Sequence, residues 1–173
     1  MGSLILTLGP MFSGKTTKSI QVYNHHNILN KSILVIKPLI DNRYDTNSIV
    51  THDKLKRNCI SVNKLSDILD INKYQVIIID EGQFFSDIYE KALEWSVSKE
   101  VYVFGLNGDS NKNLFGDIYK LLPHVDEIIF LKSLCKICCD GTPAIFSKKM
   151  INNDKIVDVG GSNMYQAVCR KHF

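Results

Sequence analysis

The sequence has 173 residues, the length of one domain with room for a small appendage. Hydrophobic residues make up 45% and charged residues 23%, so the chain can form an ordinary hydrophobic core and is not expected to be disordered. Its net charge of +3 is too small for the strongly basic surface of a typical nucleic-acid-binding domain, and no hydrophobic run reaches the roughly 20 residues of a membrane span. We therefore expect neither nucleic acid nor a membrane as a partner.

The first residues give no sign of export or lipid attachment. They lack the charged segment of a signal peptide, and Leu6 stands where a myristoylation motif needs Ser or Thr. The five cysteines are an odd number, which suits a disulfide framework poorly and favours metal binding or free thiols in a reducing compartment. We expect a cytoplasmic protein.

Five short hydrophobic segments are predicted to be buried β-strands. In chain order they cover residues 3–8, 32–37, 75–80, 101–106 and 127–131. Helices are predicted at 15 to about 29, at 87 to about 97 and, as a shorter element that turns Ile68 and Leu69 inward, at 65–69. The polar segment 41–52 is predicted to be a loop. Because hydrophobic strands that alternate with helices are typical of a parallel sheet covered on both faces, we expect an α/β fold.

The character of the sequence changes after residue 132. Four of the five cysteines follow, and two short segments around Phe146 and Val157 predict a small β-hairpin. We therefore expect an α/β core over residues 1–132 and a small C-terminal module over residues 133–173.

An eight-residue segment between the first predicted strand and helix matches the pattern G-x-x-x-x-G-K-[ST]. It consists of Gly9, Pro10, Met11, Phe12, Ser13, Gly14, Lys15 and Thr16. The glycines let backbone N–H groups point at phosphate oxygens, and the helix N-terminus adds a partial positive charge. Lys15 would reach the β- and γ-phosphates, and the Thr16 hydroxyl would ligate Mg²⁺. The sequence thus predicts a sheet of the P-loop NTPase type.

Two acidic residues follow the predicted strand at 75–80. The carboxyl ends of parallel strands share one crevice, so we expect Asp80 to meet the glycine-rich loop and to face the metal ion. The neighbouring Glu81 points elsewhere and can act as a general base toward an acceptor hydroxyl. An Asp in this position can also simply cap a turn, and the glycine-rich loop alone does not separate a small-molecule kinase from an ATPase.

Several further segments narrow this choice, because with the glycine-rich loop they resemble the cytosolic (type II) thymidine kinases. The run Asp-Glu-Gly-Gln-Phe-Phe at 80–85 carries most of the resemblance. Shorter matches follow in the same order as in that family, at 36–38, 41–44, 51–53, 105–109 and 160–165. The resemblance covers nearly the whole chain and implies transfer of the γ-phosphoryl group of ATP to the 5′-hydroxyl of thymidine or deoxyuridine.

The resemblance also implies roles for individual residues. Glu81 would accept the proton of the 5′-hydroxyl. Arg43 would lie near the transferring phosphoryl group, although it can also be a solvated loop residue. Besides the glycine-rich loop, the residues implied for ATP and Mg²⁺ are Asp41, Asp80 and Gln83. Those implied for the nucleoside are Phe84, Phe115, Ile156, Val157, Asp158, Val159, Gly160 and Tyr165, although the aromatic ones can also be ordinary packing residues. The family further implies a homotetramer and inhibition by the end product dTTP.

Three positions depart from the family pattern. Asn107 replaces the usual Asp, Ser110 stands where an aromatic residue is common, and Lys148 or Lys149 occupies the place of an Arg. We expect these differences to affect substrate range and rate more than the type of reaction.

Two short motifs near the C-terminus have the spacing of a zinc site. Cys135 and Cys138 form one, Cys169 and His172 the other, and paired motifs of this kind hold a structural Zn²⁺ with four protein ligands. Such an ion would pin both ends of a nucleoside-enclosing loop, or lasso, that contains residues 156–160. Cys139, beside the first motif, would be either unligated or a competing ligand. The alternative to a zinc site is that the cysteines are reduced thiols without a metal.

Two other functions remain open at this point. A zinc module that binds nucleic acid, with the glycine-rich loop as a nucleotide switch, would need a basic surface. An inactive scaffold would bind nucleotide without transferring phosphate.

Overall fold

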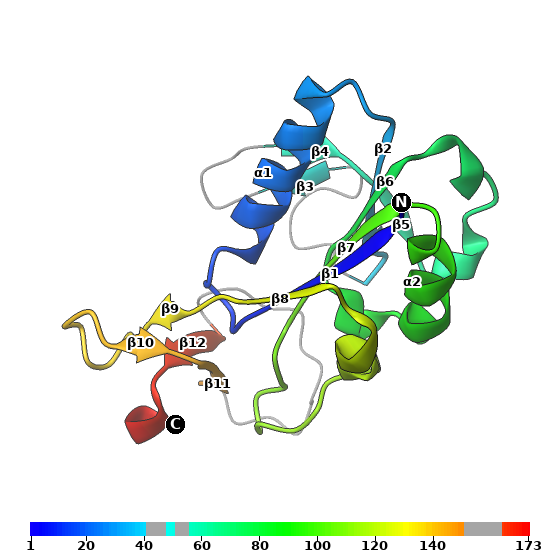
Figure 1. The fold of residues 1–173 in the computed structure, drawn as a ribbon. Coiled ribbons are helices and arrows are strands. Elements are labelled where there is room, and N and C mark those ends of the chain that lie inside the picture. Colours follow the sequence, from blue (N-terminus) through cyan, green and yellow to red (C-terminus); the bar gives the residue numbers. More distant parts are fainter. Residues whose placement is uncertain (41–47, 51–55, 151–163) are drawn as a thin grey trace.

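The computed structural model describes residues 1–40, 48–50, 56–150 and 164–173. Its centre is a six-stranded parallel sheet with the order β5-β2-β6-β7-β1-β8 (Figure 1). In chain order the strands are β1 (Ser3–Leu8), β2 (Ile33–Pro38), β5 (Ile60–Val62), β6 (Val76–Ile79), β7 (Glu100–Gly105) and β8 (Glu127–Phe130). The predicted α/β fold is confirmed.

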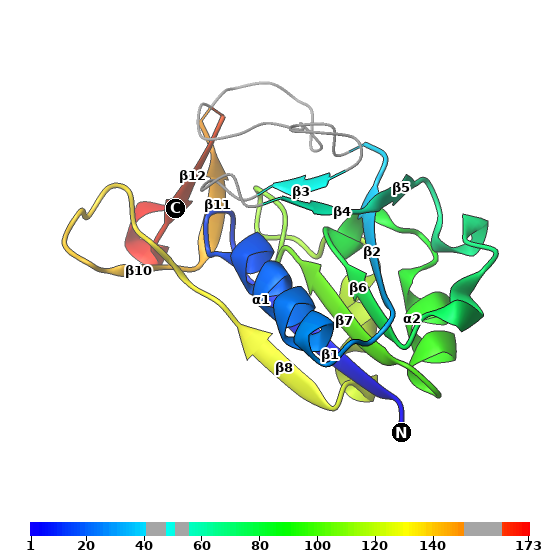
Figure 2. The same cartoon turned by 90° about the horizontal axis from the view of Figure 1, so that it is seen from above.

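Two α-helices cover opposite faces of this sheet, as Figures 1 and 2 show: α1 (Lys15–Ile28) and α2 (Ile88–Ser96). Strand β6 shows why both faces of the sheet need a cover. Its four residues are all buried, and their side chains alternate between the two faces. Val76 and Ile78 pack with the face that holds Ile20 of α1. Ile77 and Ile79 pack with α2, and each such burial of an Ile side chain contributes about 1.5–3 kcal/mol.

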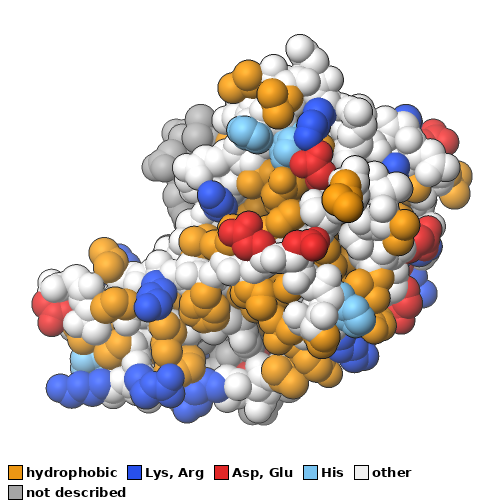
Figure 3. Space-filling view, viewed as in Figure 1, with side chains coloured by type: hydrophobic (Ala, Val, Ile, Leu, Met, Phe, Trp, Pro, Cys, Tyr) orange, Lys and Arg blue, Asp and Glu red, His pale blue; other side chains and the backbone are white. Residues whose placement is uncertain are grey.

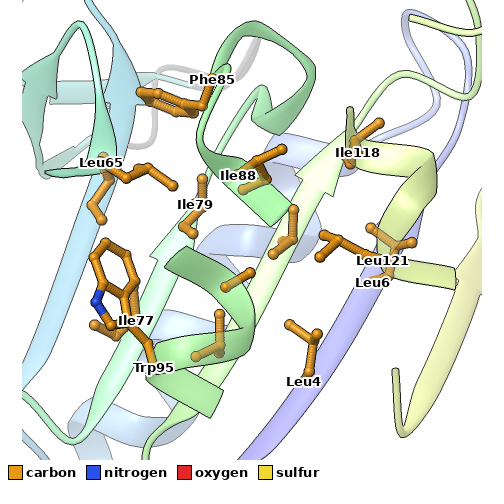
Figure 4. Close-up of a cluster of buried hydrophobic side chains, with 14 of the residues drawn as sticks. Leu4, Leu6, Leu65, Ile77, Ile79, Phe85, Ile88, Trp95, Ile118 and Leu121 are labelled. Carbon is orange, nitrogen blue, oxygen red and sulfur yellow. The ribbon is translucent and has the colours of Figure 1, made fainter. Parts of the chain in front are cut away.

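Of the two hydrophobic clusters that pack on the central sheet, the larger lies between the sheet and α2 (Figure 4). Helix α2 contributes Ile88, Ala92 and Trp95, which recur at helical spacing and face the strands. The residues labelled in the figure are Leu4, Leu6, Leu65, Ile77, Ile79, Phe85, Ile88, Trp95, Ile118 and Leu121. This cluster fixes the position of the segment that follows β6, where the predicted carboxylates lie.

The remaining elements are short. Five are 3₁₀-helices: η1 (Leu65–Asp67), η2 (Ile71–Lys73), η3 (Gly82–Phe84), η4 (Ile118–His124) and η5 (Arg170–His172). Three antiparallel pairs of strands complete the described structure: β3 (Ser48–Val50) with β4 (Lys56–Asn58), β9 (Ser133–Leu134) with β10 (Pro143–Ala144), and β11 (Phe146–Lys149) with β12 (Tyr165–Val168).

Some sequence-based expectations were wrong in detail. The predicted helix at 65–69 is the single turn η1, which ends at Asp67, so Leu69 is 91% exposed although Ile68 does pack against the core. The predicted loop 41–52 contains strand β3, and the strand that pairs with β11 is β12. The segment around Val157 lies outside the described residues.

Strand β8 was predicted to be buried, yet it is the edge of the sheet. Ile128 and Phe130 of β8 are exposed, and so is Leu134 of β9. Figure 3 shows hydrophobic side chains on this face of the molecule. None of the helices in the described ranges has the length and hydropathy to cross a membrane.

The C-terminal strands have their own small hydrophobic cluster. It contains Ala144, Ala167 and Val168 together with Cys135 and Cys169. A boundary at residue 132 stays a prediction.

Candidate active site and metal centre

The glycine-rich loop at 9–16 connects β1 to α1 at the carboxyl edge of the sheet. Gly14 has φ +85°, and Phe12 has φ 63°, so the loop curls back on itself. A Cβ atom at Gly9 would lie 2.6 Å from Ser13 Oγ and 2.7 Å from the carbonyl oxygen of Leu131, so only glycine fits there. The sequence therefore folds locally into a tight turn that exposes backbone groups at the start of α1.

Polar groups of this loop are arranged in a way that suits an anion. Lys15 is buried and its Nζ donates to the carbonyl oxygens of Gly9 (3.1 Å) and Pro10 (2.8 Å). The hydroxyl of Ser13 is buried and has no hydrogen-bond partner among the described residues. A buried hydroxyl without a partner is costly, and a phosphate oxygen would satisfy it.

The acidic pair follows β6, at the same edge of the sheet. The backbone N–H of Asp80 donates to the Ile36 carbonyl oxygen of β2 at 2.8 Å, which extends the ladder by one residue. Glu81 then turns the chain into η3 with φ 51° and ψ 44°, a left-handed conformation that costs a non-glycine residue about 1–3 kcal/mol. The backbone N–H of Glu81 also donates to Asp80 Oδ1 at 3.1 Å. Strain at a charged residue beside a glycine-rich loop is typical of an active site.

Gln83 connects Glu81 to the end of β7. Its Nε2 donates to Glu81 Oε2 at 2.6 Å, and its Oε1 accepts the backbone N–H of Leu106 at 3.1 Å. The structure thus brings Gln83 to the predicted base, and the role in ATP binding that the family resemblance implies for it stays a prediction.

Two predicted pocket residues meet beside this turn. The rings of Phe84 and Phe115 are 5.2 Å apart between centroids and nearly perpendicular, at 81°. Glycine at position 116 allows the two chain segments that carry these rings to lie close together. Gly116 has φ +63°, and a Cβ atom there would lie 2.0 Å from the backbone oxygen of Gln83. The third aromatic residue, Tyr165, is buried at the start of β12.

The glycine-rich loop also contacts the C-terminal strands, which the sequence did not predict. The backbone N–H of Met11 donates to Ser147 Oγ at 2.8 Å, and Phe12 packs against the small C-terminal hydrophobic cluster. Asn107 Nδ2 donates to the Ile145 carbonyl oxygen at 3.0 Å. An ionised Asp in place of Asn107 has no proton to donate, so this departure from the family pattern creates a contact.

The Met11–Ser147 contact leads to a prediction for nucleotide affinity. Ser147→Ala removes the acceptor of a loop N–H group, so we expect KM for ATP to rise roughly three- to tenfold, as for the loss of one ordinary hydrogen bond. Ser147→Thr keeps the hydroxyl and is the matched control, expected to stay within about twofold of wild type. Steady-state kinetics at varied ATP measures both; equal KM values for Ala and Thr would contradict the role of the contact.

The four predicted metal ligands come together. Cys135 and Cys138 lie between β9 and β10, while Cys169 immediately precedes η5 and His172 is its last residue. The ligand atoms of the four residues all lie within 4.8 Å of one another. His172 Nδ1 is 3.6, 3.3 and 3.4 Å from the Sγ atoms of Cys135, Cys138 and Cys169, and the last two sulfurs are 3.8 Å apart.

These separations match a tetrahedral zinc ion. With bonds of about 2.3 Å to sulfur and about 2.05 Å to nitrogen, the edges of the tetrahedron are about 3.8 Å between sulfurs and about 3.5 Å from sulfur to nitrogen. The donor set Cys₃His is itself typical of structural zinc. The cluster could therefore hold a metal ion, with Nδ1 as the histidine ligand.

The thiols of Cys135 and Cys138 have different pKa values because their surroundings differ. Burial alone would raise the pKa of Cys135, but hydrogen bonds from the backbone N–H groups of Cys138 and Cys169 and from His172 outweigh it and lower that pKa to about 5. Burial and the neighbouring sulfurs raise the pKa of Cys138 to about 11. Without metal, Cys135 is thus a thiolate at neutral pH and Cys138 a thiol.

Contacts around η5 hold the histidine ligand in place. Lys148 Nζ donates to the His172 carbonyl oxygen at 3.1 Å. The ring of Phe173 packs against that of Phe146, with centroids 5.2 Å apart, and lies under the Lys112 ammonium at 4.0 Å. Cys139 is exposed and its thiol donates to the Lys136 carbonyl oxygen, so it lies outside the metal cluster.

Several predicted site residues lie outside the described part of the chain. They are Asp41, Arg43, Ile156, Val157, Asp158, Val159 and Gly160. Sequence reasoning missed Ser147, because a serine in a short strand carries no motif.

The fold and this site define a class of protein: an α/β protein with a doubly covered parallel sheet, a glycine-rich loop after the first strand and a Cys₃His cluster. Comparison with known families is more specific, since the sequence model of the thymidine kinase family matches residues 2–173. The chain belongs to the thymidine kinase family, which consists of phosphotransferases.

Individual relatives match nearly the whole of this chain. The chain is 39% identical to a thymidine kinase of fowlpox virus, covering 99% of this chain and 97% of the relative. It is also 39% identical to a thymidine kinase of monkeypox virus, with 98% and 96% covered. A thymidine kinase of rice, Oryza sativa, is 35% identical over 99% of this chain and 66% of its own length.

Proposed function

We propose that this protein is an ATP-dependent kinase that transfers the γ-phosphoryl group of ATP to the 5′-hydroxyl of thymidine or deoxyuridine, giving dTMP and ADP in the first case. The observation that carries the proposal is the strained Glu81 beside Asp80, at the sheet edge that also holds the glycine-rich loop. Membership of the thymidine kinase family supports the nucleoside as acceptor.

Residues 9–16 bind the triphosphate, as in other P-loop proteins. Lys15, which lies over the carbonyl oxygens of its own loop, turns to the β- and γ-phosphates, and the unpartnered Ser13 hydroxyl finds an acceptor there. Thr16 and Asp80 are the residues that would hold Mg²⁺ with the nucleotide, and Asp41 and Gln83 complete the proposed set. A bound Mg²⁺ offsets the negative charge of the phosphate oxygens.

Glu81 accepts the proton of the 5′-hydroxyl as that oxygen attacks the γ-phosphorus. The attacking oxygen forms the new P–O bond, the bond to the β–γ bridging oxygen breaks, and ADP leaves. Arg43 is proposed to offset the charge on the transferring group through its guanidinium.

The nucleoside lies beside Phe84 and Phe115, whose edge-to-face pair offers an apolar wall for the base. Tyr165 and the segment 156–160 enclose its other side, with backbone groups of that segment reading the thymine edge. This assignment follows from the family resemblance.

Zn²⁺ in the Cys₃His cluster has a structural role. All four tetrahedral positions are filled by Cys135, Cys138, Cys169 and His172, so no position is left for substrate. We infer that residues 133–173 form a zinc-binding domain, an inference that their separate hydrophobic cluster supports.

Association into a homotetramer, inhibition by dTTP and a cytoplasmic location belong to the same proposal. The exposed hydrophobic side chains on edge strand β8 support contact between copies of the chain. Light scattering during size-exclusion chromatography tests the tetramer, and dTTP titration of the activity tests the inhibition.

A nucleoside panel tests the activity. Purified, zinc-replete protein with ATP and Mg²⁺ is expected to phosphorylate thymidine and to leave deoxycytidine and purine nucleosides unchanged. Because EDTA would strip zinc as well as Mg²⁺, the magnesium-free control uses desalted, zinc-replete protein without added chelator. If ATP binds but no nucleoside is phosphorylated, the protein is a nucleotide-binding scaffold.

A further inference from the structure

Residues 107–116, which we call the bridge, follow β7 and contact the C-terminal module at two points. Asn107 Nδ2 donates to the Ile145 carbonyl oxygen at 3.0 Å. Lys112 Nζ lies 4.0 Å from the ring centroid of Phe173, which is a cation–π distance. Neither contact is made by the glycine-rich loop or by a metal ligand. The bridge is therefore a separate connection between the module and the rest of the protein.

Hydrogen bonds to one aspartate give the bridge a defined shape. Asp109 Oδ1 accepts the backbone N–H groups of Asn111 and Asn113, both at 2.8 Å. The backbone N–H of Lys112 donates to the Asp109 carbonyl oxygen at 3.2 Å. Lys112 itself has φ 67°, a left-handed conformation that persists in a non-glycine residue only where its surroundings hold it. The backbone from which the ammonium group extends is therefore fixed.

The far end of the bridge lies at the predicted nucleoside pocket. Phe115 is three residues after Lys112, and its ring contacts that of Phe84 at 5.2 Å between centroids. At Gly116 the backbone is so close to Gln83 that a Cβ atom would lie 2.0 Å from the Gln83 backbone oxygen. A displacement at Lys112 can therefore be absorbed by very few residues before it reaches Phe115.

The metal cluster determines where the partner of Lys112 lies. Phe173 directly follows the ligand His172, whose carbonyl oxygen accepts a hydrogen bond from Lys148 Nζ at 3.1 Å. The Phe173 ring also packs against that of Phe146, with centroids 5.2 Å apart. With zinc bound to His172, the Phe173 ring is held under Lys112. Without zinc, η5 loses that anchor.

We propose that the bridge couples the zinc site to the nucleoside pocket, with Asn107 and Lys112 as positioning residues. Both act through Phe115, because they hold the segment that carries this ring against the C-terminal module. The proposal rests on the proposed function, since it takes thymidine as the ligand of the Phe84–Phe115 pair. Coupling of this kind is reciprocal, so zinc raises thymidine affinity by the same factor by which thymidine raises zinc affinity.

Removing both module contacts tests the coupling. Asn107→Ala deletes the amide donor and Lys112→Met deletes the charge. Calorimetry, with a non-hydrolysable ATP analogue present, measures the thymidine affinity of zinc-replete protein and of the same protein carrying Cys138→Ser. We expect this ratio of affinities to be roughly tenfold in wild type, within the usual range for coupled sites.

The same ratio should fall to about threefold in Asn107→Ala/Lys112→Met, because each lost contact contributes a few-fold. It should not reach one, since the contacts of Met11 and Phe12 with the module remain. KM for ATP should stay within about twofold of wild type in the zinc-replete double variant, which separates the coupling from a general loss of structure. Thermal unfolding checks that each protein is folded.

Two further variants show whether the effect belongs to these contacts. Lys112→Arg keeps a cation over the Phe173 ring and should stay within about twofold of wild type in thymidine affinity. Lys120→Met is the matched control, because it removes the same charge from η4, where Lys120 Nζ pairs with Asp117 Oδ1 at 3.0 Å. It should leave the zinc dependence of thymidine affinity unchanged.

A measurement without nucleoside separates this proposal from the proposed function. The sequence has eight phenylalanines, so ¹⁵N-Phe labelling allows the amide NMR signal of Phe115 to be assigned through Phe115→Leu. Cys138→Ser should move this signal in wild type and move it much less in Asn107→Ala/Lys112→Met. If wild type binds no thymidine, the proposed function fails and this signal alone decides the coupling. A zinc dependence, of thymidine affinity or of the Phe115 signal, that is equal in wild type and the double variant would overturn the proposal.

Discussion

Glu81→Gln is expected to lower kcat for thymidine phosphorylation roughly 10²–10⁴-fold, the usual contribution of a general base. The substitution keeps the length of the side chain and a carbonyl oxygen that can accept the hydrogen bond from Gln83. It removes only the ability to take a proton. Because the backbone at position 81 is left-handed and disfavours both residues similarly, the turn into η3 should not change.

The experiment is a comparison of kcat with thymidine binding. We expect thymidine affinity, measured by calorimetry in the presence of a non-hydrolysable ATP analogue, to stay within a few-fold of wild type. Glu94→Gln is the matched control, since Glu94 is an exposed residue of α2 and the change in charge is the same. Near-normal turnover of Glu81→Gln would show that the base is a different group, and Asp80→Asn would then be the next variant.

The strands were predicted well where both faces of the sheet are covered. The strand predicted at 75–80 contains four consecutive β-branched residues because β6 lies in the interior of the sheet, and these four residues are the observed strand, Val76–Ile79. For β8 the strand was also predicted, but its expected burial was wrong. A hydrophobic segment indicates that a strand is present, but it does not indicate where that strand lies in the sheet. The sequence therefore could not show that β8 has a neighbouring strand on one side only.

The metal cluster was predicted because its ligands occur in two compact motifs with conventional spacing, and the structure brings the same four side chains together. The contacts that join this module to the rest of the protein have no such signal. Met11 and Ser147 are 136 positions apart, and Asn107 and Ile145 are 38 apart. Each is one hydrogen bond between common residue types, which arises only when the whole chain has folded.

Zinc bound at this cluster is expected to stabilise the folded protein. Cys138→Ser removes one of the four ligands, and we expect its zinc content to fall well below one ion per chain. Wild type in free zinc at a thousand times the dissociation constant gains about 4 kcal/mol over metal-free protein. For a chain of this length that corresponds to roughly 8–16 °C in Tm, which the variant should lose. Cys139→Ser is the matched control, because the adjacent thiol lies outside the cluster and should leave zinc content and Tm unchanged.

The metal-free protein should also bind ATP more weakly, and not only thymidine. Phe12 and Met11 of the glycine-rich loop both contact the C-terminal module, so its loosening removes support from the phosphate site. Calorimetry with Cys138→Ser and Cys139→Ser measures the ATP affinity of each variant. An unchanged ATP affinity in zinc-free Cys138→Ser would show that zinc affects only the binding of the nucleoside.

Zinc binding should release protons at pH 7, because Cys138, with its pKa raised to about 11, must lose its proton to become a ligand. Cys135 is already a thiolate until the pH falls through about 5, so it releases none. Zinc affinity should therefore decrease as the pH is lowered from 7, and more steeply below about 5, where Cys135 also takes up a proton. Titrations of zinc into metal-free protein, in two buffers of different ionisation enthalpy, measure this release; a proton count of zero would show that Cys138 is already ionised in the metal-free cluster.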